Sequence, residues 1–356
     1  MTRYVVIGAG AVGGALAADL HLAGVPVVLS ARGAALDAVR ERGLVRTSPG
    51  GTVRVPVPVV GGPADVPLTR DDVLVLATKT QDAHATLADW AWRPLAGGGL
   101  AADLPVITLQ NGLDAERAAA RHFSTVVGGT AMVAARCLVP GEVVTGAAPK
   151  TGQLVVGAFP PAAPPPAVAV RFVADAGAAG WLAQAVADVT RWKAWKLLHN
   201  VTNATELFTG APDALADVRR RATEEARAVL AAAGYEPADP DTERTYDPAE
   251  ASLVPGGGYV PGQQSTWQSF ARGTTSEVDF LNGEITLLGR LHGVAAPVNA
   301  ALQRVLGASA LAGERPGARD IAEVFALLPP PVPPTATPTA PASGPDTEEP
   351  TGVLTS

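Results

Sequence analysis

Short runs of apolar residues alternate with longer stretches of helical periodicity through the first half of the chain. The apolar runs are residues 4–7, 26–30, 73–77, 105–109 and 125–128. A strand that is covered by helices on both faces is apolar at every position, whereas a strand with one face in water alternates apolar and polar residues. The uninterrupted runs therefore predict parallel strands connected by crossover helices, with residues 43–60 forming a hairpin or irregular strands.

The pattern changes to helical periodicity from residue 189 onward. A helix is predicted to begin there, a second to span residues 212–234, and a third to begin at Ser276, whose hydroxyl can cap it. Gly293 suits the end of the third helix, because glycine adopts the left-handed conformation at low cost. Residues 236–262, rich in Pro, Gly and Asp, are predicted to form a long loop.

These patterns predict two domains and a tail. Residues 1–188 are expected to form a Rossmann-type, doubly wound α/β domain, and residues 189–327 an all-helical domain that carries substrate-binding and catalytic groups. The expected site is a cleft between the two. The proline-rich residues 160–166 are expected to form a surface loop. Residues 328–356 are dominated by Pro, Thr, Ala and Glu and are expected to be disordered, since they can bury little apolar surface.

Composition and charge exclude several classes of protein. Of the 356 residues, 47% are hydrophobic and 17% are charged, which provides enough apolar material for large cores. The net charge of −7 and the lack of a basic cluster argue against nucleic acid as a partner, because phosphate contacts need Lys and Arg. Cys137 is the only cysteine, so an intrachain disulfide and a cysteine-based metal cluster are both excluded.

No targeting or membrane segment is predicted. The chain enters an apolar strand almost directly after Met1, without the basic leader of a secretory signal. Residues 4–29 are apolar enough to resemble a membrane span, but Asp19, His21 and several glycines interrupt them. We therefore expect a soluble, cytoplasmic protein, and a single cysteine fits a reducing compartment.

A glycine-rich loop follows the first predicted strand directly and opens a helix that is expected to run to about Ala23. Its residues are Gly8, Ala9, Gly10, Ala11, Val12 and Gly13. In a dinucleotide-binding fold, the first glycine allows the tight turn, the second lets the backbone approach a pyrophosphate, and the third lets helix and strand pack closely. The amides of the helix N-terminus then face the phosphates. The alternative is a glycine-rich turn that binds no ligand.

The end of the second predicted strand indicates which dinucleotide is bound. An NAD enzyme places an acidic residue there, on the ribose 2′-hydroxyl, whereas this chain has Ser30 and Arg32. A guanidinium can pair with the 2′-phosphate of NADP, which an acid would repel. NADP(H) is therefore the predicted cofactor. The alternative interpretation makes Arg32 an exposed loop charge.

Two later strands also end in polar residues. Lys79 and Asn111 follow the runs 73–77 and 105–109. Ligands bind outside the carboxyl ends of the strands in open α/β sheets, so both residues are candidates for the site. The alternative is that they are solvated residues of loops and turns.

One face of the helix that begins near residue 189 carries polar groups. Lys196, Asn200 and Asn203 are separated by four and three residues and share that face, which suits a polar substrate. A partly buried lysine can exchange a proton near neutral pH. The alternative is an ordinary exposed polar stripe. His199 is predicted to point elsewhere on this helix and to be structural.

These motifs together resemble those of the ketopantoate reductase (2-dehydropantoate 2-reductase) family, over residues 1 to about 310. The resemblance rests on the glycine loop with Arg32, Lys79 in Ala-Thr-Lys-Thr, Asn111 in Gln-Asn-Gly, Lys196 in Trp-Lys-Leu-Leu-His-Asn, and Ser265 twelve residues before Glu277. It implies NADPH-dependent reduction of a small 2-oxo acid. Ketopantoate, reduced to pantoate in pantothenate biosynthesis, is the first candidate substrate.

The resemblance also implies roles that spacing does not show. It makes Lys196 the acid that protonates the carbonyl oxygen, and Glu277 an essential residue near the nicotinamide ribose. Asn111 would contact both cofactor and substrate. Without the resemblance, Glu277 reads as a surface acid that favours its helix dipole. The other implied contacts are those of Lys79 and Ala135 with the cofactor, and of Asn200 and Ser265 with the substrate. Asn203 is a further candidate for the substrate, from its place on the same predicted helix face as Lys196 and Asn200.

Departures from the family pattern concern the substrate. Family members that make pantoate typically carry asparagine where this chain has Ala204 and Gly262, and near Asp213, whereas Asn203 lies one residue early. Reduction of another branched or aromatic 2-oxo acid is therefore an alternative. A non-catalytic NADP-binding regulatory protein is another, although retention of the lysine and the glutamate favours an enzyme. A homodimer is implied by the family alone, and no metal site is predicted.

Overall fold

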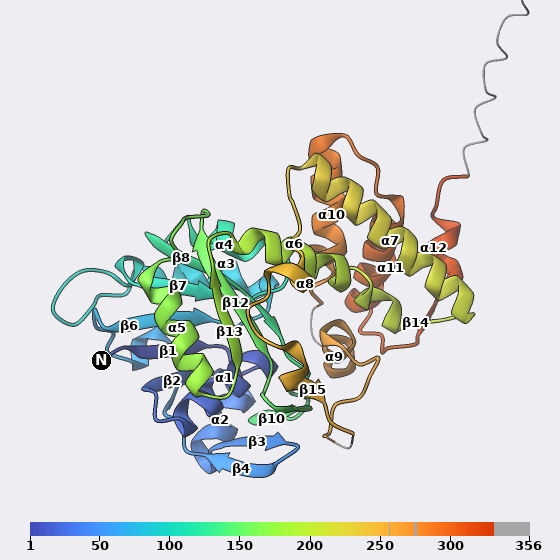
Figure 1. Cartoon of the computed structure of the whole chain (residues 1–356). Helices are drawn as coiled ribbons and strands as arrows, with labels where there is room; N and C mark the ends of the chain where they lie inside the picture. The colour runs from blue at the N-terminus through green and yellow to red at the C-terminus, as the bar shows by residue number, and fades with distance from the viewer. Residues whose placement is uncertain (256, 274–275, 331–356) are drawn as a thin grey trace, which may run out of the picture.

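The protein has two lobes, one built on a sheet and one on helices (Figure 1). The computed structural model describes residues 1–255, 257–273 and 276–330. Most of the tail that is predicted to be disordered, residues 331–356, lies outside the described residues. The arrangement confirms the predicted combination of a Rossmann-type domain with a helical one.

A central sheet organises the first lobe. Across it lie β13 (Leu182–Val186), β12 (Gln153–Phe159), β8 (Thr125–Met132), β7 (Pro105–Thr108), β6 (Asp72–Leu76), β1 (Arg3–Ile7), β2 (Val27–Ser30) and β5 (Val59–Val60). Neighbouring strands are parallel except β8 and β12, which are antiparallel. The five strands predicted from apolar runs are confirmed. The chain order reverses at β1, between β2 and β6, and such a switch point is where doubly wound sheets bind ligands.

Helices cover both faces of this sheet. Helices α1 (Ala11–Leu22) and α5 (Ala167–Ala178) pack on one face, and α3 (Thr80–Ala91) and α4 (Asp114–Ala119) on the other. Alternate residues of β1 pack into the cores on the two faces of the sheet. Tyr4 and Val6 pack in the core with α1 and α5, and Val5 and Ile7 pack in the core with α3 and α4. Two-sided burial explains why the strand is apolar throughout.

A smaller sheet lies beside α1. It consists of β4 (Gly51–Val55), β3 (Leu44–Ser48), β10 (Glu142–Thr145) and β9 (Ala135–Arg136), with α2 (Gly33–Arg42) leading into it. The antiparallel pair β3 and β4 is the hairpin that residues 43–60 predict. Residues 160–166 form the predicted loop between β12 and α5, largely exposed.

Strands β12 and β13 are not anticipated by the apolar runs. The sequence of β13, Leu-Ala-Gln-Ala-Val, is rich in alanine, which favours helix more than strand. Its parallel pairing with β12 along the sheet edge overrides that local preference. Tertiary pairing therefore sets the conformation of residues 182–186.

The second lobe is helical, as predicted. Its main elements are α6 (Val189–Asn200), η3 (Asn203–Leu207), α7 (Pro212–Ala232), α9 (Ser265–Arg272), α10 (Val278–His292), α11 (Pro297–Leu311) and α12 (Ala322–Ala326). Short strands β14 (Phe208–Thr209) and β16 (Arg319–Asp320) pair within it. The described residues of the range 236–262 are mainly irregular, with α8 (Pro240–Glu243), η4 (Pro248–Glu250) and β15 (Ala251–Leu253), which pairs with β11 (Ala147–Pro149).

The predicted start of the third helix needs a correction. Helix α10 begins at Val278, two residues after Ser276, and Glu277 occupies the N-cap position. The Ser276 hydroxyl still accepts a hydrogen bond from the Val278 amide at 3.1 Å, so it does satisfy a free donor of the first turn. The predicted end is confirmed, because Gly293 follows the helix with φ of +71°.

Helix α6 connects the two lobes. Its Trp192 packs against Val155 of β12 in the sheet lobe, while Leu197 and Leu198 pack with residues of α7 and α10, including Ile285. A helix fixed on both sides presents its remaining face to the space between the lobes. Lys196 lies on this helix.

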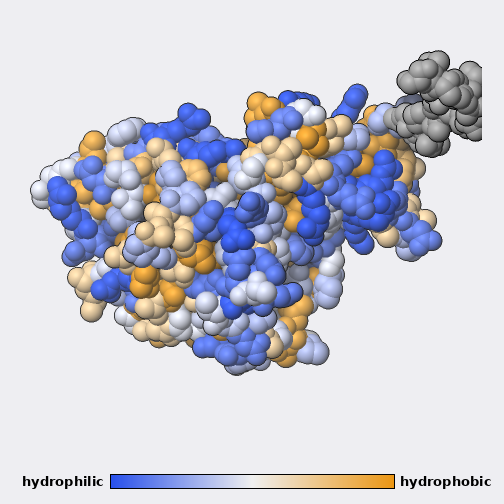
Figure 2. All heavy atoms as spheres, turned by 45° about the horizontal axis from the view of Figure 1, so that its top comes forward, coloured by the Kyte–Doolittle hydropathy of each residue, from blue (hydrophilic) through white to orange (hydrophobic). Residues whose placement is uncertain are grey.

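None of the described helices is both long enough and apolar enough to span a membrane. On the face drawn in Figure 2, hydrophobic residues are broken up by hydrophilic ones over both lobes.

Candidate active site

A cavity of about 570 Å³ lies between the lobes, over the carboxyl ends of β1 and β6. Most of the residues singled out from the sequence line it: Gly8, Gly10, Ala11, Val12, Lys79, Asn111, Ala135, Lys196, Asn200, Asn203, Ser265 and Glu277. Three others, Ala9, Gly13 and Arg32, are not part of its lining. The fold thus brings together residues that are up to 269 positions apart, from Gly8 to Glu277.

The glycine loop has the geometry of a phosphate cradle. Gly8 has φ of +118°, and a Cβ atom there would stand 2.8 Å from the Ala77 carbonyl carbon. A Cβ atom at Gly13 would stand 2.1 Å from the Gly8 carbonyl oxygen. Gly10, in contrast, has no atom within 4 Å of such a position. The first and third glycines are therefore required by the turn and by packing, and the second leaves open space at the N-terminus of α1, which fits a dinucleotide pyrophosphate.

Arg32 lies outside this cavity, at the carboxyl end of β2. It precedes α2 as the N-cap residue, and its side chain is 65% exposed. The guanidinium Nη2 atom lies 3.4 Å from Asp89 Oδ2, and Asp89 is on α3. Arg32 is thus held next to the end of the strand by a weak surface ion pair that an incoming anion can replace.

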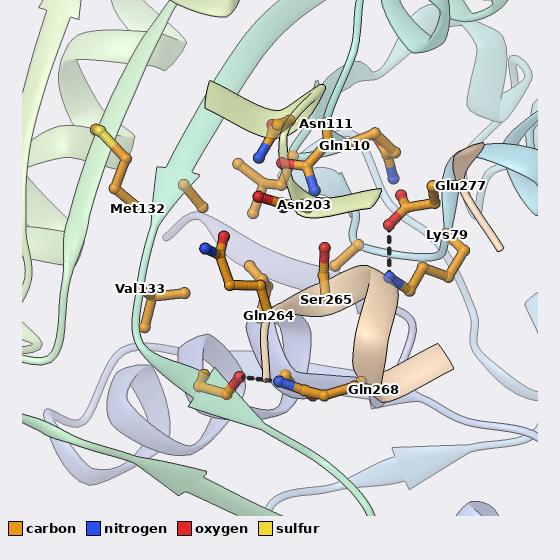
Figure 3. A pocket seen from close by; sticks show the side chains of 18 of the residues that line it. Lys79, Gln110, Asn111, Met132, Val133, Asn203, Gln264, Ser265, Gln268 and Glu277 are labelled. Carbon is orange, nitrogen blue, oxygen red and sulfur yellow. Dashed lines mark hydrogen bonds and ion pairs between the residues drawn. The ribbon is translucent and has the colours of Figure 1, made fainter. Parts of the chain in front are cut away.

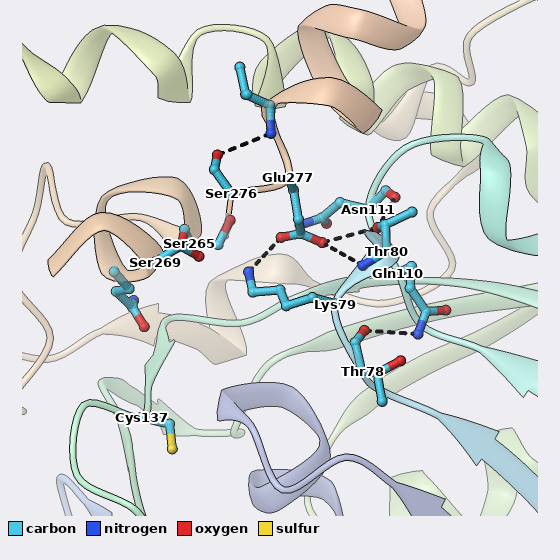
Figure 4. A network of polar contacts seen from close by, with 12 residues as sticks. Thr78, Lys79, Thr80, Gln110, Asn111, Cys137, Ser265, Ser269, Ser276 and Glu277 are labelled. Atoms are coloured by element: carbon cyan, nitrogen blue, oxygen red, sulfur yellow. Dashed lines mark hydrogen bonds and ion pairs between the residues drawn. The ribbon is translucent and has the colours of Figure 1, made fainter. Parts of the chain in front are cut away.

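Glu277 is buried in a network that joins the two lobes (Figure 4). Its carboxylate accepts hydrogen bonds from Lys79 Nζ at 2.5 Å and from the Thr80 amide at 3.3 Å. The Thr80 hydroxyl has one proton for two acceptors, the Glu277 carboxylate at 3.1 Å and the Asn111 carbonyl at 3.2 Å. Burial alone would raise the pKa of Glu277, but Lys79 and the Thr80 donors lower it below its ordinary value. The carboxylate is therefore ionised near neutral pH.

Lys196 lies in a buried position, where loss of water destabilises the charged form of its side chain. Its Nζ atom donates a hydrogen bond to the Ala131 carbonyl of β8. Burial, followed by the nearby charge of Lys193, lowers the pKa of Lys196 from 10.5 to about 7; Lys79 adds to the effect and Glu277 opposes it. A group with this pKa can both give and take a proton at physiological pH, as a catalytic acid must.

A second buried ion pair lies near Lys196, and no sequence motif predicts it. Lys193 Nζ lies 2.5 Å from Glu116 Oε1 and donates to the Gln110 carbonyl at 2.9 Å. Glu116 also accepts from the Thr108 hydroxyl at 2.6 Å. The pair therefore ties α6 to α4 and to the turn that carries Asn111. Its two members are 77 residues apart, so no local motif marks it.

The opposite side of the cavity carries neutral polar groups. Figure 3 shows Gln264 and Ser265 pointing from the start of α9 toward Asn203, the first residue of η3. Asn200 is buried, and its Oδ1 atom has no hydrogen-bond partner among the described residues. A buried acceptor without a partner is costly unless a bound molecule donates to it, so this side fits a substrate with hydroxyl or similar donors.

Several lining residues were missed. His199, which was expected to point elsewhere on the helix and to be structural, is exposed and lies on another strip of α6, but it also lines the cavity, with its ring centroid 4.9 Å from that of Trp195. Trp195 and His199 are four residues apart, like Lys196 and Asn200, and occupy the adjacent strip of α6. The other lining residues that no sequence motif marks include Met132, Val133, Tyr259, Gln264, Gln268 and Arg272.

Within the described ranges, no three His, Cys, Asp or Glu side chains are grouped closely enough to hold a metal ion.

Comparisons with known proteins agree over almost the whole described chain. Residues 4–161 match the family described as ketopantoate reductase PanE/ApbA, and residues 188–310 match its C-terminal domain. A 2-dehydropantoate 2-reductase from Archaeoglobus fulgidus is 28% identical over 309 residues, which cover 84% of this chain and 95% of that protein.

Two solved structures have a similar fold. A PanE/ApbA family ketopantoate reductase from Ralstonia eutropha JMP134 has a TM-score of 0.69 and 24% identity, covering 88% of this chain and 99% of its own. A D-mandelate dehydrogenase, solved with NADH and anilino(oxo)acetate, has a TM-score of 0.69 and 21% identity with the same coverage.

Proposed function

Because this chain belongs to the ketopantoate reductase family of oxidoreductases that act on 2-oxo acids, we propose that it reduces ketopantoate to pantoate with NADPH. One observation carries the proposal: Lys196, with a pKa of about 7, shares a cavity between the lobes with Asn111 and Glu277. We also propose that the domain boundary lies near residue 188, between β13 and α6.

Reduction of the keto group requires transfer of a hydride and of a proton, and we assign the proton to Lys196. The bound cofactor would supply hydride to the keto carbon. Protonated Lys196 donates a hydrogen bond to the keto oxygen, stabilises the negative charge that develops there, and transfers its proton to form the hydroxyl. One proton is consumed for each 2-oxo acid reduced, and it returns to Lys196 from water.

Binding is assigned to the remaining groups. The open space at Gly10 and the N-terminus of α1 would hold the cofactor pyrophosphate. Lys79, Asn111, Ala135 and Glu277 would line the rest of the cofactor site, with Glu277 next to the nicotinamide ribose. The substrate would be held by Asn111, Asn200, Asn203 and Ser265, with Ser265 near its carboxylate.

The preference for NADPH is assigned to Arg32. We expect Arg32→Glu to raise the Kd of NADPH at least about tenfold and that of NADH less than about twofold, because only NADPH carries the 2′-phosphate. Titration of the change in cofactor fluorescence on binding measures both constants. Arg40→Glu, which makes the same charge change on the exposed side of α2, is the matched control. Equal losses for the two cofactors in Arg32→Glu would refute the assignment.

A bulkier 2-oxo acid is the second candidate substrate. Trp195, Met132 and Val133 give the cavity an apolar wall close to Lys196, and the His199 ring packs against Trp195 at a tilt of 59°. Aromatic side chains make favourable contacts with such surfaces. This wall, together with Ala204 in place of an asparagine, favours a substrate with a branched or aromatic side chain.

A panel of 2-oxo acids tests both candidates. NADPH oxidation is followed by absorbance with ketopantoate, 2-oxoisovalerate and phenylglyoxylate, and each kcat/KM is repeated with NADH. The highest kcat/KM for ketopantoate supports the proposal, and the highest for phenylglyoxylate supports the second candidate. Protein that binds NADPH but turns over no member of a broad panel would instead be a non-catalytic binder.

A further inference from the structure

Arg272 is the last residue of α9 and brings a guanidinium from the helical lobe to the cavity. Its Nη1 atom donates to the Cys137 carbonyl at 2.7 Å. One turn earlier on α9, Gln268 Nε2 donates to the Ala135 carbonyl at 3.1 Å. These two bonds fix the C-terminal part of α9 to residues 135–137 of the sheet lobe.

The segment held by Arg272 lies against the glycine loop. The Cys137 thiol approaches the Ala9 carbonyl at 3.8 Å, and the cavity that Arg272 lines is also lined by Gly8 and Gly10. Ser265 stands at the other end of α9, seven residues away and therefore about 10 Å along the helix axis. Arg272 thus lies at the end of α9 that is near the glycine loop, and Ser265 lies at the end that faces Asn203.

The positive charge of Arg272 is not compensated within the described part of the chain. Its Nε atom is buried without a hydrogen-bond partner, and no described carboxylate forms an ion pair with it. The other two cations of the cavity are less available to an anion. Lys79 pairs with Glu277, and Lys196 loses its charge near pH 7.

We propose that Arg272 binds the pyrophosphate of the nicotinamide cofactor from the side opposite the glycine loop. A guanidinium offers two parallel N–H donors to phosphate oxygens and cannot lose its charge near neutral pH. The helical lobe would then hold the cofactor directly, so that closure of the two lobes and cofactor binding depend on each other. The inference rests on the proposed function only in requiring a dinucleotide cofactor.

Binding measurements without substrate test the role. In Arg272→Gln we expect the Kd of NADPH, NADH and ADP-ribose to rise at least about tenfold, since all three contain the pyrophosphate. Adenosine 2′-monophosphate, which has no pyrophosphate, should bind within about twofold of its wild-type Kd. Arg272→Lys keeps the charge and should recover part of the loss.

Arg315→Gln is the matched control. Arg315 also donates to backbone carbonyls of α9, those of Phe270 and Ala271, but does not line the cavity. Its Kd values should equal those of the wild type, and thermal unfolding of each variant checks that the fold is retained.

Three results would overturn the inference. Unchanged dinucleotide affinity in Arg272→Gln overturns the inference but leaves the proposed function intact. A raised KM for the 2-oxo acid with unchanged NADPH affinity does so too and assigns Arg272 to the substrate carboxylate. Failure of the wild-type protein to bind any dinucleotide overturns the proposed function as well.

Discussion

Replacing Lys196 with methionine should lower kcat for 2-oxo acid reduction by at least about a hundredfold. Methionine keeps an unbranched side chain of similar length, so the cavity wall is preserved while the proposed proton donor is lost. The proton then has to come from water, and no ammonium stabilises the developing charge on the keto oxygen. Stopped assays of NADPH oxidation at saturating substrate measure kcat, and fluorescence titration measures the Kd of NADPH, which should change less than about twofold.

Lys150→Met is the control for the loss of a lysine. Lys150 follows β11 and does not line the cavity, so kcat should stay at the wild-type level. A near wild-type kcat in Lys196→Met would remove Lys196 from the mechanism, whatever its pKa.

Glu277→Gln should lower kcat/KM by on the order of a hundredfold. Glutamine has the same shape but no charge, so Lys79 loses its ion-pair partner in the cavity between the lobes. The substitution also affects Lys196. Because the Glu277 carboxylate raises the pKa of Lys196, its removal should lower that pKa further and leave less of Lys196 charged at neutral pH.

A double-mutant cycle separates this network from a general loss of stability. If Lys79 and Glu277 act as a pair, Lys79→Met combined with Glu277→Gln should cost clearly less than the sum of the two single changes. Asp279→Asn is the matched control, because it neutralises an exposed acid in the first turn of the same helix. Additive losses, or an equal loss in Asp279→Asn, would contradict the role of the pair.

Local sequence patterns predict the parts of the fold that depend on neighbours in the chain. The glycine loop is an example, because the contact of Gly13 with the Gly8 carbonyl and the open space at Gly10 both lie within a few residues of Gly8, although Gly8 itself packs against Ala77. Residues 182–186 are the counterexample, since their strand conformation comes from pairing with β12 and not from their own composition. The apolar runs therefore predict the central strands of the sheet and miss its edge.

The site depends on contacts that no local pattern contains. Glu277 has the local environment of a surface acid at the start of a helix, yet its carboxylate lies against Lys79, 198 residues away. The role of Lys193 likewise cannot be predicted from the local sequence, because only the fold shows that it is buried with Glu116 and contributes to the lowered pKa of Lys196. For Glu277, the resemblance to a known family supplied what periodicity could not.

The pH dependence of kcat/KM for reduction tests the central claim, that Lys196 is the proton donor, most directly. The donor must be protonated, and burial beside Lys193 lowers its pKa to about 7. The rate constant should therefore be level below pH 7 and fall about tenfold per pH unit above it. In Glu277→Gln the break should move to lower pH. A wild-type profile that stays flat to pH 9, or rises above neutrality, would contradict the account.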